Sequence, residues 1–346
     1  MSVLVAEKGE PALEATHAAG GMIAHCDPHN PQALAGMIAA SARMYPEFVR
    51  ELRDEAFESP DLRDAGTIAF FEADESSKCD GSRALDEAIL ACLEPLIALR
   101  GRAFFLPECS VDPRKLGSAL EKAARHRGVD FVTGSPVREV AVLGGRATGV
   151  RTARAFYAAG AVVNCAGAWA AQIRPFGAPT RPVKGQMLCV VPTAASLSQA
   201  RDVWVGHPKH GPLIQHTIRT AEVYIIPRSD GRIVLGATVE EAAFDKRVQA
   251  ETVQRLHHAA TRVVPEIGHM RIHDAWAGLR PGSPDGLPIL GATSLPGYYV
   301  ATGHYRDGIL LAPITAYVMT QLMTGQATEF DLAPFSLKRF DRQNGC

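Results

Sequence analysis

The segment GYYVATGHYRDGILLAPITAYVMTQLM, residues 297–323, places the strongest constraint on the fold. An apolar strand leads through a loop with Gly303 and Gly308 into a helix that is apolar almost all round, so we expect a buried helix. This junction brings unpaired backbone N–H groups and the positive end of a helix dipole to one point, which favours an anion or an electron-rich ring edge. Glycine permits close approach of a ligand to the backbone, with His304 and Arg306 beside it. The alternative is that the two glycines only form the turn.

Composition and charge narrow the class of protein. A chain of 346 residues with 47% hydrophobic residues can bury a large core, and its length suggests two domains. Lysine and arginine number 36 against 37 acidic residues, so we expect no nucleic-acid or membrane partner. The longest apolar stretch, residues 308–323, is too short to span a bilayer and contains Pro313, and no signal peptide opens the chain. Seven scattered cysteines without a C-x-x-C pair argue against a disulfide framework and favour a reducing compartment, the cytoplasm.

Helix and strand patterns alternate along the chain, which predicts a mixed α/β fold. Asn30 followed by Pro31, and Asp112 followed by Pro113, each predict a helix N-terminus. Runs on either side of Gly144 and Gly145 predict a hairpin with a primed turn. From residue 182 to 235 the pattern becomes strand-rich, which indicates a second subdomain, and a helical pattern returns at residues 251–264.

Three further features are candidates for binding or catalysis. Arg280 follows an apolar strand and precedes a proline, which suits a rigid clamp on a carboxylate, although a solvated surface arginine is the more common case. Tyr224 lies on one strand of a predicted hairpin and faces either a core or a cavity. His25 and His29 have a spacing that could bind a metal, but a polar loop that enters a helix explains them more simply, so we predict no metal site.

Six segments in chain order resemble the flavin-dependent amino-acid oxidase family, which includes D-amino-acid oxidase and sarcosine oxidase, and most of all its glycine oxidases of thiamine biosynthesis. They are VLVAEKGEPALEATHAAGGM, VVNCAGAWA, RPVKGQML, YIIPRSDGRIVLGAT, WAGLRPGSPDGLPILG and ATGHYRDGILLAP. The resemblance implies a Rossmann-like FAD-binding domain and an antiparallel-sheet domain that covers the flavin. It places the FAD-binding domain at residues 1–40, 108–172 and 272–330, the substrate domain at 41–107 and 173–271, and a tail at 331–346.

The resemblance also implies roles for individual residues. Arg280 and Tyr224 would bind the substrate carboxylate, Arg306 would lie on the flavin side of the pocket, and Met22 would bound it. Residues implied to bind the cofactor are Glu7, at the ribose, Val137, near the adenine, Ala166, Gly167 and Trp169, in a turn beside it, and Gly303, His304, Arg306, Asp307, Gly308, Ile309 and Leu310, along the isoalloxazine edge.

The reaction that the resemblance implies is oxidation of an amine next to a carboxylate. Hydride passes from the α-carbon to the flavin, water hydrolyses the imine, and O2 takes up the electrons to give hydrogen peroxide. No acid or base residue is required, because a substrate bound as the free amine can lose hydride without one. Sarcosine, proline or a D-amino acid are alternative substrates, a quinone is an alternative acceptor, and a homo-oligomer is possible.

The first residues carry one more expectation. In a Rossmann-like unit, a strand, a G-x-G-x-x-G turn and a helix come before the acidic strand end that Glu7 resembles. We therefore expect that about 30 residues of this unit are absent before Met1. A start assigned at an internal methionine and a shortened, non-catalytic remnant that does not retain FAD are the two interpretations.

Overall fold

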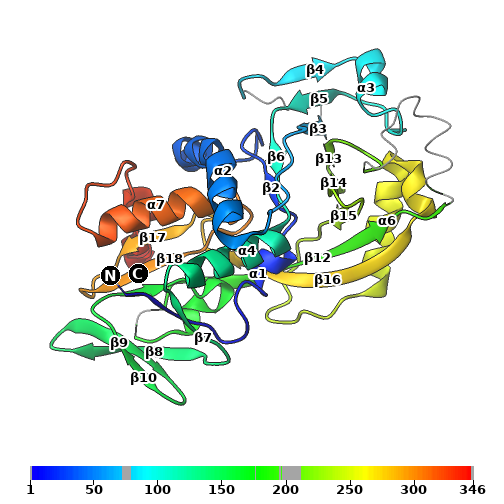
Figure 1. The fold of residues 1–346 in the computed structure, drawn as a ribbon. Coiled ribbons are helices and arrows are strands. Elements are labelled where there is room, and N and C mark those ends of the chain that lie inside the picture. The colour runs from blue at the N-terminus through cyan, green and yellow to red at the C-terminus, as the bar shows by residue number, and fades with distance from the viewer. Residues whose placement is uncertain (1, 72–78, 176, 195, 197–211, 344–346) are drawn as a thin grey trace.

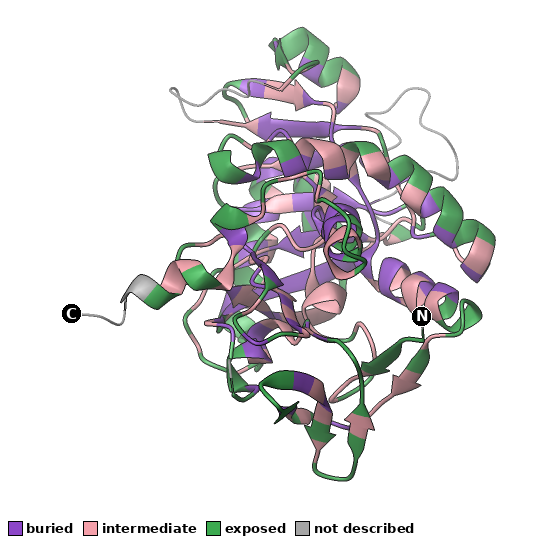
Figure 2. Cartoon of the chain, turned by 90° about the vertical axis from the view of Figure 1, so that its left-hand side faces the viewer, coloured by how far each residue is buried: buried purple, intermediate pink, exposed green. Residues whose placement is uncertain are grey.

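The structure is a computed structural model that describes residues 2–71, 79–175, 177–194, 196 and 212–343. Figure 1 shows two parts side by side, one built on a large sheet and the other on several small sheets with helices. In Figure 2 the buried residues concentrate in the central strands, and the outer hairpins and helix faces are exposed. Among the helices of the described residues, none combines the length and apolar character that a bilayer crossing requires.

The large sheet has eight strands in the order β16-β12-β15-β14-β13-β3-β5-β4. Their bounds are β3 Thr67–Phe70, β4 Arg83–Leu85, β5 Ala103–Leu106, β12 Arg181–Val191, β13 Thr217–Arg219, β14 Tyr224–Pro227, β15 Ile233–Gly236 and β16 Arg271–Gly282. Neighbouring strands run antiparallel except β13 and β3. Aliphatic side chains of these strands pack with α6 (Ala250–Val263), near α3 (Glu87–Leu93) and the 3-10 helix η3 (Pro265–His269), and form the first core.

The second part contains four small sheets. Their strands are β1 (Leu4–Ala6) parallel to β7 (Asp130–Val132), β2 (Met22–Ile23) with β6 (Cys109–Ser110), β8 (Val137–Leu143) with β9 (Arg146–Thr152) and β10 (Phe156–Ala158), and β18 (Tyr298–Thr302) between β11 (Val162–Asn164) and β17 (Ile289–Ala292). The helices α2 (Ala35–Ala56), α4 (Pro113–His126) and α7 (Ala312–Met323) share a second core. The other short helices of the described residues are α1 (Ala15–Ala18), η1 (Gln32–Leu34), η2 (Gly167–Gln172), η4 (Ala333–Phe335) and η5 (Leu337–Gln343).

Several local predictions are confirmed. Asp112 caps α4, since its carboxylate accepts hydrogen bonds from the N–H groups of Arg114 (3.0 Å) and Lys115 (3.4 Å). Gly144 and Gly145 join β8 to β9, and both have the positive φ that a primed turn requires. The strands β14 and β15 form the predicted hairpin.

Two predictions about helices are wrong. Asn30 does not cap a helix, because its side chain donates to the carbonyl of Ala24 (2.9 Å) and α2 begins only at Ala35. The helix α7 is not buried all round, because Ala316, Tyr317 and Thr320 are exposed. Its buried residues pack against α2 and β17, and its remaining face is exposed, so composition overstated its burial.

The domain division from the sequence stays a prediction. The strand pairing adds one fact, which is that β16 pairs along its length with β12 and so belongs to the large sheet. The candidate site lies where this strand ends.

Candidate functional site

Arg280 lies on β16, opposite Val183 of β12. Its Nη1 donates to the carbonyl oxygens of Thr238 (3.0 Å) and Lys184 (3.4 Å). The guanidinium lies over Gly185, where an added Cβ would be 2.3 Å from Nη1. Glycine at position 185 therefore leaves the space that the guanidinium fills. Both contacts to carbonyls use Nη1, and a guanidinium has further donors on Nη2 and Nε.

Tyr224 lies on β14, two strands from β12 in the same sheet. It pairs with Gly236, where an added Cβ would be 2.9 Å from the Tyr224 hydroxyl. Burial raises the pKa of Tyr224, and the positive charge of Arg280 acts in the opposite direction. The phenol therefore stays protonated at neutral pH and can donate a hydrogen bond. Tyr224 pairs with Gly236, and Gly236 pairs with Met187 of β12, four positions from Val183, the partner of Arg280. The strand register therefore places Tyr224 and Arg280 on one face of the large sheet.

Met22 belongs to the same region. Its side chain packs on a buried cluster of Met187, Ile226 and Val234, and Tyr224 and Trp276 pack on that cluster as well. The cluster joins the start of β2 to the face of the large sheet that carries Arg280 and Tyr224.

Residues 303–311, which we call the glycine loop, connect β18 to α7. Gly303 has φ +75°, which favours glycine, whereas Gly308 has no positive φ and is not required for the turn. The hydroxyls of Ser41 and Tyr45 on α2 donate to the carbonyls of Leu310 (2.6 Å) and Ile309. No hydrogen bond among the described residues uses the N–H groups of residues 308–310. The loop thus presents unpaired donors just before the N-terminus of α7.

The glycine loop is tied to the end of β16. The N–H of Tyr305 donates to the carbonyl of Pro281, the residue after Arg280, at 3.1 Å. This hydrogen bond brings the part of the loop just before the unpaired N–H groups next to the residue that follows Arg280. One cavity of about 330 Å³ lies elsewhere, lined by Phe70, Leu99 and Arg262 among others, and contains no predicted site residue. The candidate site is therefore defined by the guanidinium of Arg280 and the N–H groups of residues 308–310, and not by that cavity.

The loop carries one ion pair and two residues with shifted pKa values, Asp307 and His304. Arg306, whose side chain is 55% exposed, pairs with Asp27 at 3.7 Å. Burial raises the pKa of Asp307 to about 6, with the charge of Arg306 opposing this. Burial lowers the pKa of His304 to about 4, and its Nε2 is 3.0 Å from the Thr315 hydroxyl. His304 is therefore neutral at pH 7 and contributes no charge to the loop.

The turn after β11 reaches the glycine loop. The carbonyl of Gly167 accepts from the Thr302 hydroxyl (3.3 Å), at the residue before Gly303, and the N–H of Ala166 donates to Asn164 (3.1 Å). The Trp169 ring instead contacts Phe244 (ring centroids 5.3 Å apart) and the ammonium of Lys8, 3.4 Å from its centroid.

Glu7 and Val137 lie further from Arg280. The backbone N–H and C=O of Glu7 bond Val132 and Ser135, so it lies beside the turn that leads to β8. Val137 begins β8 and packs, with Ala166, against one shared apolar cluster. Val137 and Ala166 therefore lie close to the same apolar cluster in the part built on the small sheets.

The cysteine expectation is wrong at one place. Cys26 and Cys79 form a disulfide, although 53 positions separate them. The spacing carried no signal for this pair, because only the fold brings the loop after β2 next to the chain before β4. The histidine pair is not brought together as a ligand set: the potential metal ligands that lie within 4.8 Å of one another in the described chain are His25, Cys26 and Cys79. The two sulfurs of this group are bonded to each other.

Sequence reasoning missed the residues that position the predicted ones. Thr238 supplies the carbonyl for Arg280, Gly185 supplies its space, and Asp27 pairs with Arg306. Ser41 and Tyr45 fix the carbonyls of the glycine loop from more than 260 positions away. Their i,i+4 spacing on a helix was readable, but nothing local indicated what they would contact.

Comparison with known proteins fits this geometry. The family model "FAD dependent oxidoreductase" matches residues 1–322. A glycine oxidase of Geobacillus kaustophilus is 31% identical over 360 residues, covering 97% of this chain and 90% of that protein. The crystal structure of glycine oxidase from Geobacillus kaustophilus superposes with a TM-score of 0.85 at 30% identity, covering 98% of this chain and 92% of that one.

The bifunctional protein ThiO/ThiG of Synechocystis is 33% identical over 334 residues and is covered to 49% of its length, with 95% of this chain matched. The hydrogen cyanide synthase subunit HcnC of Pseudomonas protegens is 33% identical, with 90% of this chain and 75% of that protein covered. The chain thus spans about half the length of the bifunctional relative and three-quarters of HcnC. By its family match and its fold, the chain belongs to the FAD-dependent oxidoreductase family.

Proposed function

We propose that this protein oxidises glycine or a similarly small amino acid in an FAD-dependent reaction. The observation that carries the proposal is the arrangement of Arg280 and Tyr224 on one sheet, next to a glycine loop with unpaired N–H groups. The glycine oxidases among the relatives support the same substrate class.

The residues present fit FAD by one structural criterion. The buried start of α7 leaves the N–H groups of residues 308–310 without partners, and such groups are normally satisfied. The electron-poor end of a helix dipole next to them would stabilise negative charge on a ring edge. The chemistry that FAD supplies when bound is a two-electron oxidation.

The protein's own groups would bind and orient the substrate. Arg280 would pair with the carboxylate through its planar fork, and the protonated Tyr224 would donate to the same group. Met22, on the neighbouring apolar cluster, would bound the side of the pocket and disfavour large side chains. Arg306, partly neutralised by Asp27, would keep the flavin side of the pocket positive. No general base is assigned, because a substrate bound as the free amine needs none.

The test starts with the visible spectrum of the purified 346-residue protein. We expect a flavin band that bleaches when glycine is added anaerobically and returns with oxygen, together with hydrogen peroxide. An Arg280→Met variant should keep the band but require a glycine concentration higher by about 100-fold, because it loses a charge-assisted pair. Arg271→Met, on the exposed start of the same strand, is the matched control.

Two results would contradict parts of the proposal. A colourless protein that takes up no FAD would favour a non-catalytic remnant. A flavin band that bleaches with sarcosine, proline or a D-amino acid but not with glycine would identify a different substrate. Bleaching without hydrogen peroxide would favour a quinone as the electron acceptor. A role in thiamine biosynthesis, a cytoplasmic location, a homo-oligomeric state and the domain boundaries given above remain proposals alongside it.

A further inference from the structure

Arg228 is a buried charge that the proposed chemistry does not use. It follows β14 directly and is 1% exposed. Its Nη1 donates to the carbonyl of Val111 (2.8 Å) and its Nη2 to the carbonyl of Gly20 (2.6 Å). Both acceptors lie outside the large sheet, so the side chain joins the two parts of the molecule.

The strand register places Arg228 on the same face as Tyr224. Residues 224, 226 and 228 alternate along β14 and its extension, so their side chains point to one side of the sheet. An added Cβ on Gly20 would be 2.9 Å from Cδ1 of Ile226 and 3.3 Å from Cε2 of Tyr224. All three side chains therefore contact residues 18–22, which we call the docking segment.

The docking segment is fixed by backbone contacts on both sides. The carbonyl of Gly21 accepts from the N–H of Val111 (2.8 Å), whose own carbonyl accepts from Arg228. Gly21 has φ +81°, and an added Cβ there would be 2.0 Å from the Val111 oxygen. Trp276 donates from its Nε1 to the carbonyl of Ala18 (3.2 Å). The guanidinium of Arg228 thus bridges two neighbouring backbone segments through two separate nitrogens, whereas an ammonium has one nitrogen on a differently shaped side chain.

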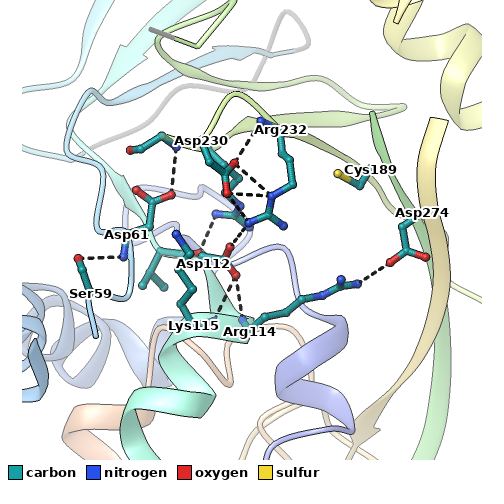
Figure 3. A network of polar contacts seen from close by, with 12 residues as sticks. Ser59, Asp61, Asp112, Arg114, Lys115, Cys189, Asp230, Arg232 and Asp274 are labelled. Atoms are coloured by element: carbon teal, nitrogen blue, oxygen red, sulfur yellow. Dashed lines mark hydrogen bonds and ion pairs between the residues drawn. The ribbon is translucent and has the colours of Figure 1, made fainter. Parts of the chain in front are cut away.

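The neighbouring Arg232 makes a different set of contacts. Figure 3 shows its guanidinium between the carboxylates of Asp230 and Asp112, at 2.8 Å from each. It lies on the same hairpin and carries the same charge, but its hydrogen bonds go to carboxylates and not to the docking segment. Arg232 is therefore a matched comparison for Arg228.

We infer that Arg228 is a positioning residue for the substrate site: by holding the carbonyl of Gly20 it seats the docking segment, with Met22, against Tyr224. This inference rests on the proposed function, since it assigns Tyr224 to the substrate carboxylate. Without the bridge, Gly20 would no longer be held against the Tyr224 ring, and the hydroxyl would lose its fixed place beside Arg280.

The experiment compares Arg228→Met, Arg228→Lys and Arg232→Gln with the wild type. For each protein we would measure the flavin spectrum, KM and kcat for glycine, and the Kd of acetate, a non-reacting carboxylate, by the change in the flavin band. For Arg228→Met we expect KM and the acetate Kd to rise by about tenfold or more while the flavin content is retained. Arg228→Lys should recover part of this loss, and Arg232→Gln should keep the wild-type values.

Wild-type KM and acetate Kd in Arg228→Met, with only a lower melting temperature, would overturn the inference and leave Arg228 a purely structural residue. If Arg228→Met does not fold, Arg228→Lys decides, because wild-type constants in that variant contradict the need for a two-point bridge. A wild-type protein without a flavin band or turnover would reject the proposed function, and this inference with it. An active wild type with unaffected variants rejects the inference alone.

Discussion

At the scale of single residues, the site depends on two glycines that leave room for the side chains of other residues. The guanidinium of Arg280 occupies the space above Gly185, and the Tyr224 ring occupies the space above Gly236. A strand residue normally carries a side chain that packs on its neighbours, so glycine inside a strand often marks a close approach. The identities of residues 185 and 236 are therefore part of the candidate site, although neither contributes a functional group.

Gly185→Ala tests this role directly. The new Cβ would lie 2.3 Å from Nη1, so the guanidinium must move. We expect KM for glycine to rise by about tenfold, with a smaller change in kcat, because the interaction lost is with the carboxylate and not with the reacting carbon. Gly160→Ala is the control, since nothing lies within 4 Å of its added Cβ. Equal kinetic constants in both variants would show that Arg280 does not bind the carboxylate from this position.

The acidity of Asp307 gives a prediction about pH. Because burial raises its pKa to about 6 from 3.8, the folded protein binds more protons than the unfolded chain between these values. The free energy of unfolding that depends on Asp307 therefore falls as the pH rises through this window. Asp307→Asn removes the penalty, so relative to the wild type it should gain about 1 to 2 kcal/mol at about pH 7.5 and only about a third of that at about pH 4.5.

Denaturant unfolding of both proteins at the two pH values provides the measurement. The shift of His304 has the opposite sign, because a histidine kept neutral by burial loses stability as the pH falls below its unfolded value. Comparing the variant with the wild type at each pH cancels this contribution. If the difference in free energy of unfolding between Asp307→Asn and the wild type does not change with pH, the pKa of Asp307 is not raised.

At the scale of elements, α2 serves as a support for the glycine loop. Ser41 and Tyr45 are four positions apart, so both face the same side of the helix, and both are fully buried. Their hydroxyls donate to two successive carbonyls, those of Leu310 and Ile309, and the Ser41 hydroxyl also accepts from the N–H of Ile314 (3.4 Å). With the carbonyls fixed this way, the N–H groups on the other side of each peptide plane are also fixed in direction.

Replacing one donor tests the support. Tyr45→Phe removes one of the two hydrogen bonds that the carbonyl of Ile309 accepts, the other coming from the N–H of Ala312 (3.1 Å), so we expect a loss of about 1 kcal/mol in the free energy of unfolding. FAD affinity should fall as well, because the loop loses its fixed direction. Tyr317→Phe, an exposed position on α7, should stay within about 0.5 kcal/mol of the wild type. An unchanged FAD affinity in Tyr45→Phe would show that the hydrogen bond from Tyr45 to the glycine loop does not contribute to FAD binding.

At the scale of the whole molecule, the candidate site lies at the junction of the two parts seen in Figure 1. Arg228 and Trp276 join the large sheet to the docking segment, and Phe244 contacts Trp169 across the same junction. Lys246 pairs with Glu14 at 3.0 Å nearby. A ligand that contacts both parts would add to these links, because it binds the assembled arrangement and not the separated one.

Addition and removal of FAD should therefore change the stability of the whole chain. At an FAD concentration about 100 times its Kd, we expect a gain of about 2.7 kcal/mol and a single cooperative unfolding transition. Removal of the cofactor should lower the melting temperature, and riboflavin alone should restore less of it than FAD. Thermal unfolding followed by tyrosine and tryptophan signals measures this. A melting temperature that does not respond to FAD would contradict a site built by both parts.

The sequence by itself determined the features that depend on neighbouring residues. Asp112 and Pro113 predicted the start of α4 because a cap acts on N–H groups two or three residues away. Gly144 and Gly145 predicted the β8–β9 hairpin because a primed turn needs positive φ at both positions. The six family segments predicted the FAD-dependent class, which the family match and the fold confirm.

Only the tertiary structure decided the contacts between distant segments. Asn30 bonds Ala24 and does not cap α2, Cys26 joins Cys79, and Arg228 reaches Gly20 across more than 200 positions. The residues next to Asn30, Cys26 or Arg228 in the sequence would be the same whichever partner its side chain took. Which partner it takes depends on the order of the strands in the sheet and on the packing of its two parts, and that information is spread over the whole chain.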